Sequence, residues 1–147
     1  MKNPFRRLSV IASLLLLMGG AAVADADGPK IAMQGYDAVA YFTVATPTKG
    51  SPEFTHVWDG ERYLFSSAVQ RDRFAKEPER YAPQFHGLCA ASLVRGEVVT
   101  PDPQHWLIID GKLYLFGRAI GPKLFREDPN LAKNAESSWI RMQKPAN

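Results

Sequence analysis

Two Asp-Gly steps constrain the fold of this chain more than any other feature. Asp59-Gly60 and Asp110-Gly111 each separate two short stretches in which large apolar residues alternate with other residues. Asp-Gly supplies the positive φ angles that a tight hairpin turn requires, and alternation is the pattern of a half-buried strand. The sequence therefore predicts two β-hairpins with positive φ at Gly60 and Gly111. Their strands are expected at residues 54–58, 62–65, 106–109 and 113–116.

The two hairpin segments resemble each other. Trp58 to Phe65 reads WDGERYLF, and Ile109 to Phe116 reads IDGKLYLF. Both are followed by sequence of helical character. Two explanations stay open at this point: an internal duplication, or two examples of a common turn in one small domain.

Short helical segments are expected around the hairpins. Ser66 or Ser67 can cap a helix that runs to about Lys76, and Asp37 is placed to cap a turn through residues 38–42. Another turn is expected from Pro78, because proline is favoured in the first turn of a helix. Further helices are expected at residues 88–95, 122–126 and 131–142. The predicted fold class is α+β, a small single domain with two β-hairpins packed against several short helices.

Residues 1–24 have the pattern of a secretory signal peptide. A basic start is followed by the apolar run from Leu8 to Met18, and Ala22 and Ala24 occupy the small-residue positions of a cleavage site. The run is shorter than the ~20 apolar residues that span a bilayer. We therefore expect cleavage before Asp25, a periplasmic location and no stable membrane anchor afterwards. An uncleaved anchor is the alternative.

Charge and cysteine usage limit what the exported chain can do. Residues 1–24 hold three basic and no acidic residues, so the remainder has 15 of each sign. No basic surplus is left for nucleic acid, which is therefore excluded as a partner. Cys89 is the sole cysteine, so no internal disulfide can form. A polar lead-in is expected at residues 25–30, the domain at residues 31–142 and a C-terminal tail at residues 143–147.

Several ordered blocks resemble the YHS-domain proteins, in particular a small exported group with a Gly-Tyr-Asp-x-Val-Ala-Tyr-Phe opening. The resemblance covers residues 31 to about 142. The matching blocks are Gly35–Phe42, Asp59-Gly60 with Tyr63–Ser67, Arg71–Phe74, Pro78–Gln84, Gly87–Ala90 and Asp110–Leu115.

The resemblance implies a small α+β unit of YHS type, similar in places to metal-binding TRASH domains. Some members carry paired cysteines and are linked to copper or other heavy metals. This chain departs from that pattern because it keeps Cys89 alone. His86 stands where related exported proteins more usually have a glycine, and Leu88 stands where they have a tyrosine.

His86 and Cys89 are a pair of soft ligands three residues apart. Imidazole and thiolate together suit Cu(I) or Zn(II), so copper or zinc is the expected cofactor if a metal is bound. A complete site needs further donors, and His56 is the third expected ligand, with His105 or Met33 as other candidates. The competing interpretation is a buried structural cysteine with a surface or capping histidine.

The same pair could also act as a nucleophile and its base. A thiol enzyme needs an orienting group and an oxyanion site, and no signature of a known thiol-enzyme family surrounds Cys89. A non-enzyme is therefore expected.

Tyr36, Asp37 and Tyr41 form a polar-aromatic cluster with two interpretations. Asp37 could face a pocket as an acid or ligand, or it could cap a helix between two core tyrosines. The function expected from the whole sequence is an exported binding module, possibly for a transition metal such as copper. The alternative is a metal-free domain that binds a small molecule or a protein.

Overall fold

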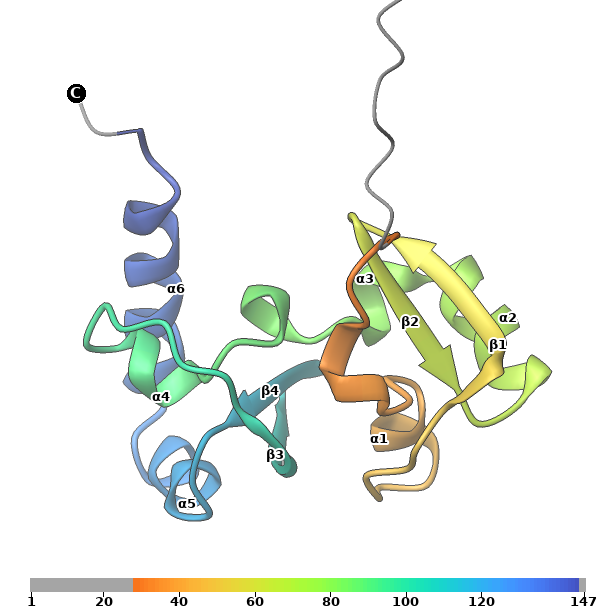
Figure 1. The fold of residues 1–147 in the computed structure, drawn as a ribbon. Helices are drawn as coiled ribbons and strands as arrows, with labels where there is room; N and C mark the ends of the chain where they lie inside the picture. Colours follow the sequence, from red (N-terminus) through yellow and green to blue (C-terminus); the bar gives the residue numbers. More distant parts are fainter. Residues whose placement is uncertain (1–27, 146–147) are drawn as a thin grey trace, which may run out of the picture.

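The computed structural model describes residues 28–145, so the expected signal peptide at residues 1–24 lies outside the described residues. The fold is α+β, as predicted, and consists of two halves that lie side by side (Figure 1). No helix within residues 28–145 is long and apolar enough to cross a bilayer. The first half contains the 3-10 turn η1 (Ala32–Gly35), α1 (Ala40–Thr43), β1 (Ser51–Trp58), β2 (Glu61–Phe65), α2 (Ala68–Lys76) and α3 (Pro78–Tyr81). The second half contains the 3-10 turn η2 (Gln84–Gly87), α4 (Ala90–Leu93), β3 (Asp102–Ile109), β4 (Lys112–Phe116), α5 (Ile120–Glu127) and α6 (Asn130–Met142).

The second half repeats the architecture of the first. Strands β1 and β2 pair from Trp58↔Glu61 back to Thr55↔Leu64, and β3 and β4 pair in the same register 51 residues further along the chain. Both hairpins have an irregularity at the same place, between Ser51 and Thr55 and between Asp102 and Trp106. The resemblance between the two hairpin sequences is therefore part of a repeated structural unit. We call residues 31–82 repeat one and residues 83–142 repeat two.

Each repeat opens with the same unusual backbone. Two residues with positive φ precede a glycine with positive φ in η1 and again in η2. These turns were not predicted from the sequence, since left-handed backbone at non-glycine residues is uncommon. The residues are Met33, Gln34 and Gly35 in repeat one and Phe85, His86 and Gly87 in repeat two.

Both Asp-Gly steps form tight turns, as predicted. Gly60 has a φ of +76° and Gly111 a φ of +75°, and the aspartate before each is also left-handed. The strands β1 and β3 begin earlier than expected, at Ser51 and Asp102. The irregularity in each register interrupts the alternation there, which is why the pattern failed to mark the start.

The helices agree with the sequence in part. Ser67 is the cap of α2, because its Oγ accepts a hydrogen bond from the Gln70 amide at 3.3 Å. The helix expected at residues 88–95 is shorter, and α4 covers only Ala90–Leu93. Leu88 and Cys89 are extended, so the helix cannot begin before Ala90, and the left-handed Gly96 lies beyond its end. Helix α5 begins at Ile120, two residues before the expected Pro122, because a proline in the first turn displaces no helical hydrogen bond.

The core lies in three clusters. One fills repeat one around Phe74, which packs on Phe65 at 5.1 Å between ring centroids. A second fills repeat two around Phe125, which packs on Phe116 at 4.8 Å. The third joins the repeats, because Tyr41 of repeat one packs with Leu113 and Leu115 of β4. This shared cluster makes the two repeats one domain.

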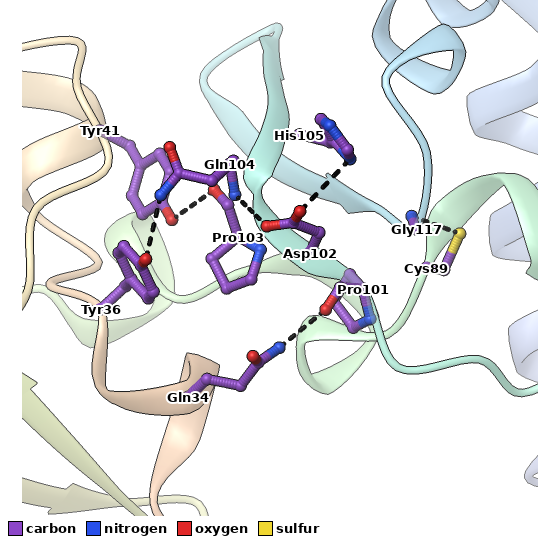
Figure 2. A network of polar contacts seen from close by, with 10 residues as sticks. All are labelled: Gln34, Tyr36, Tyr41, Cys89, Pro101, Asp102, Pro103, Gln104, His105 and Gly117. Atoms are coloured by element: carbon purple, nitrogen blue, oxygen red, sulfur yellow. Dashed lines mark hydrogen bonds and ion pairs between the residues drawn. The ribbon is translucent and has the colours of Figure 1, made fainter.

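Polar contacts support the same junction (Figure 2). The Tyr41 hydroxyl donates to the Pro103 carbonyl at 2.9 Å, and the Gln34 side-chain amide donates to the Pro101 carbonyl at 2.7 Å. Gln104 Nε2 donates to the Tyr36 hydroxyl at 3.0 Å. Burial raises the pKa of Tyr41 well above its ordinary value, so this phenol stays a neutral donor. Both tyrosines of the polar-aromatic cluster therefore have structural partners in repeat two.

Candidate functional site

Asp37 and Cys89 occupy equivalent buried positions in the two repeats. Each follows the left-handed turn of its repeat, and each donates its backbone amide across to a loop carbonyl. The Asp37 amide donates to Thr48 at 2.8 Å and the Cys89 amide to Val99 at 2.9 Å. The repeated fold therefore places one polar side chain in each repeat at the point where the second hairpin strand ends.

Asp37 is fully occupied by structural hydrogen bonds. Its Oδ1 accepts from the amides of Val39 and Ala40 at 2.9 and 3.2 Å. Its Oδ2 accepts from the amide and the hydroxyl of Ser66 at 2.9 and 2.7 Å. A buried carboxylate with this many donors is well satisfied. Its surroundings agree with the expected capping role and leave no acceptor site for a ligand.

Cys89 has a different environment at the same place. The side chain is 3% exposed, and Sγ accepts from the Gly117 amide at 3.1 Å (Figure 2). Sγ also accepts from the Ser92 hydroxyl at 3.3 Å. Gly117 stands where Ser66 stands in repeat one, so the hydroxyl that saturates Asp37 has no counterpart. The thiol is buried, in agreement with one of the two sequence interpretations, yet it lines an open groove.

The groove beside Cys89 has a volume of about 600 Å³. We call it the Cys89 groove. Cys89, Phe116 and Gly117 line it, together with apolar side chains that are unusually exposed for their type. These are Val99, Ile120 and Leu124, at 39%, 51% and 42% exposure. Exposed apolar residues that gather around a concavity are typical of a binding surface.

Two arginines add positive charge to this groove. Arg95 forms an ion pair with Glu97 at 2.7 Å, and their hydrogen bond raises the pKa of Arg95 and lowers that of Glu97. Arg118 also lines the groove and forms no ion pair with any residue in the described range 28–145. The groove thus combines apolar side chains with one uncompensated guanidinium, which suits an anionic group.

Repeat one has a polar bridge at the equivalent place. There Gln70 Nε2 of α2 donates to Thr43 Oγ1 of α1 at 2.8 Å. Gly121 is the counterpart of Gln70, since the two hairpins are offset by 51 residues. A Cβ on Gly121 would lie 2.6 Å from the Phe116 side chain, so only glycine allows α5 to lie this close. Gly121 has no side chain that could form this bridge in repeat two.

The three predicted metal ligands lie in three different surroundings. His86 lines a separate cleft, where its Nε2 is 3.6 Å from Asp59 Oδ2 and its ring is 5.6 Å from that of Trp139. His56 lies on β1 against Phe74, at 6.0 Å between rings, which agrees with a histidine packed among aromatics. Within residues 28–145 no group of three or more His, Cys, Asp or Glu side chains could hold a metal ion.

The other candidate donors do not complete a site with Cys89. Met33 packs with the core clusters of repeat one and the junction. His105 Nδ1 is buried, has no hydrogen-bond partner among residues 28–145, and lies 3.9 Å from Asp102 Oδ2. Cys89 therefore has hydrogen-bond donors as its polar neighbours, and the expected His-x-x-Cys pair is divided between two cavities.

Sequence reasoning missed the residues that shape the groove, above all Gly117, Gly121 and Arg118. A signal for them was present in the sequence. Aligning the two hairpin segments places Gly117 opposite Ser66 and Gly121 opposite Gln70, so repeat two has glycine where repeat one has two polar side chains. Differences of this kind at matching positions indicate where the two repeats differ in their surroundings.

Comparisons with protein-family models, with curated proteins and with solved structures found no match. The geometry of the chain itself therefore carries the functional argument.

Proposed function

We propose that this chain is an exported binding module of YHS type, without catalytic activity, and that repeat two binds a small organic molecule in the Cys89 groove without a metal. The observation that carries the proposal is the groove itself. It is lined by apolar side chains and a few polar groups, which is the usual composition of a small-molecule site. In repeat one, a hydrogen bond from Gln70 to Thr43 joins α2 to α1 at the position that Gly121 occupies in repeat two.

The chemistry of the lining favours an apolar molecule with an anionic group. The side chains of Val99, Ile120 and Leu124 expose apolar surface to water in the groove. A ligand that packs on these side chains removes that surface from water, which is favourable. Arg118 offers a guanidinium that can form a charge-assisted hydrogen bond with a carboxylate. The Cys89 thiol, held by the Gly117 amide, contributes a soft and weakly polar surface inside the groove.

Titration of the mature protein with octanoate, followed by amide NMR shifts, tests the proposal. We expect saturable shifts centred on Gly117, Ser92 and Ile120. Octanol, which has the same chain without the charge, should bind more weakly. Shifts that do not saturate, or that spread over both repeats alike, would contradict the proposed site.

A matched pair of variants makes this test specific. Ile120→Glu places a like charge in the groove, and we expect at least tenfold weaker octanoate binding, about 1.4 kcal/mol. Val69→Glu is the control, because Val69 is the counterpart of Ile120 in α2 and is 61% exposed. Equal effects of the two variants would exclude the groove as the site.

The same protein can be tested for the metal expected from the sequence. If Cu(I) or Zn(II) raised the melting temperature and Cys89→Ser abolished that effect, the metal-free proposal would be wrong. A hydroxyl is a poor ligand for soft metals, which makes this substitution decisive.

A further inference from the structure

A second, smaller cavity lies between the two repeats, away from the Cys89 groove. Its volume is about 190 Å³, and both repeats contribute to it. The residues that matter are Trp58, Asp59 and Tyr63 from the first hairpin, Glu79 from α3, His86 from η2 and Trp139 from α6. We call this cavity the inter-repeat cleft.

Aromatic side chains line the inter-repeat cleft from both repeats. Trp58 packs against Tyr63 at 6.3 Å between ring centroids on the repeat-one side. Trp139 packs against His86 at 5.6 Å on the repeat-two side. Both tryptophans line the cleft and are only half-buried, so a ligand can reach them. Tryptophan is the side chain that attracts cations most strongly through its ring face.

The charges in the cleft have the sign that complements a cation. Asp59 and Glu79 contribute two exposed carboxylates, whereas no lysine or arginine is among the lining residues. His86 is the only basic group there, and its Nε2 lies 3.6 Å from Asp59 Oδ2. Among the lining residues, the two carboxylates therefore outnumber the single imidazole.

Tyr63 adds an observation that is independent of charge. Its side chain lines the cleft although the residue is only 2% exposed. Its hydroxyl forms no hydrogen bond with any residue in the described range, whereas the equally buried Tyr41 hydroxyl has a partner. The hydroxyl is not among the fully enclosed unpartnered atoms of residues 28–145, so it is open to the cleft that Tyr63 lines. A ligand with an N–H group can donate a hydrogen bond to it there.

We propose that the inter-repeat cleft binds a small organic ammonium ion. The N–H group of the ligand donates a hydrogen bond to the Tyr63 hydroxyl, and its charge faces Asp59 and Glu79. The alkyl part of the ligand packs against Trp58 and Trp139. An anion would meet two carboxylates. A bare metal ion would find no group of three ligands there among residues 28–145. A primary alkylammonium satisfies the aromatic, acidic and hydroxyl surfaces together.

Tryptophan fluorescence of the mature protein provides the readout, since two of the three tryptophans line the cleft. We expect butylammonium chloride to change the emission saturably, and butanol or sodium chloride at equal concentration to leave it unchanged. Tetramethylammonium, which has no N–H, should bind at least threefold more weakly. A response to butanol equal to that of butylammonium would overturn the proposal. Equal binding of tetramethylammonium would overturn the role given to Tyr63.

Matched variants locate the effect. Asp59→Asn keeps the left-handed turn, which asparagine tolerates, and should weaken butylammonium binding at least fivefold. Asp110→Asn is the control at the equivalent turn of repeat two, outside the cleft, and should leave binding unchanged. Glu79→Gln, an exposed change on α3, should also weaken binding. If Asp59→Asn and Asp110→Asn changed the affinity for butylammonium equally, the proposed site would be refuted. Neither substitution should change the affinity of the Cys89 groove for octanoate.

Discussion

The two repeats share one backbone plan and use it differently. In repeat one the buried position holds Asp37, whose carboxylate accepts four hydrogen bonds and closes the structure around itself. In repeat two the same position holds Cys89, whose thiol accepts two and lines an open groove. The difference teaches that one backbone plan can hold either a fully hydrogen-bonded carboxylate or a thiol beside a groove at the same buried position.

The substitutions that distinguish the copies act together. Ser66 and Gln70 fill space and supply hydrogen bonds in repeat one. Their counterparts Gly117 and Gly121 supply backbone only, and Gly121 lets α5 lie against Phe116. Removing side chains usually costs stability, yet repeat two retains its own apolar core around Phe125.

The largest loss of stability is expected when the buried carboxylate of Asp37 is removed. Asp37→Ala leaves the Ser66 hydroxyl and three backbone amides without their acceptor, and we expect a loss of about 3 kcal/mol or more in unfolding free energy. Cys89→Ala removes a weaker acceptor and should cost about 1 kcal/mol. Urea denaturation of both variants checks this. Equal losses would break the proposed contrast between a closed and an open repeat.

A smaller effect is expected at the position that opens the groove. Gly121→Ala places a methyl group against the Phe116 side chain, and overpacking of this kind costs about 1–3 kcal/mol. The counterpart, Gln70→Ala, loses one exposed hydrogen bond to Thr43 and should cost under about 1 kcal/mol. Thermal denaturation of the pair compares them. If Gln70→Ala were the more harmful, the account of how repeat one is closed would need revision.

The smallest difference is expected between the two hairpin turns. Gly60→Val and Gly111→Val each force a β-branched residue into positive φ, with no neighbouring atom within 4 Å of the added Cβ. Each should destabilise the domain by about 1 kcal/mol or more through backbone strain alone. Because the two turns have nearly the same φ, the two losses should agree to within about 0.5 kcal/mol in urea denaturation. A larger gap would show that the repeats are not energetically equivalent at their turns.

Features that depend on a few neighbouring residues were predictable from the sequence. Gly60 and Gly111 form the expected turns because the Asp-Gly preference is set by the backbone of those two residues. Ser67 caps α2 because its partner is the amide three residues later. The α+β class followed from the same local patterns.

Features that depend on distant residues were decided only by the tertiary structure. Cys89 meets the Gly117 amide 28 residues later, and Tyr41 meets the Pro103 carbonyl 62 residues later. His86 and Cys89 are close in sequence, but a left-handed turn at Phe85 and His86 directs them to different cavities. Sequence by itself determined the turns, caps and fold class, since their energies are local. Packing of one repeat on the other, and of α5 on Phe116, decided the groove and the cleft, because those contacts exist only once the chain has folded.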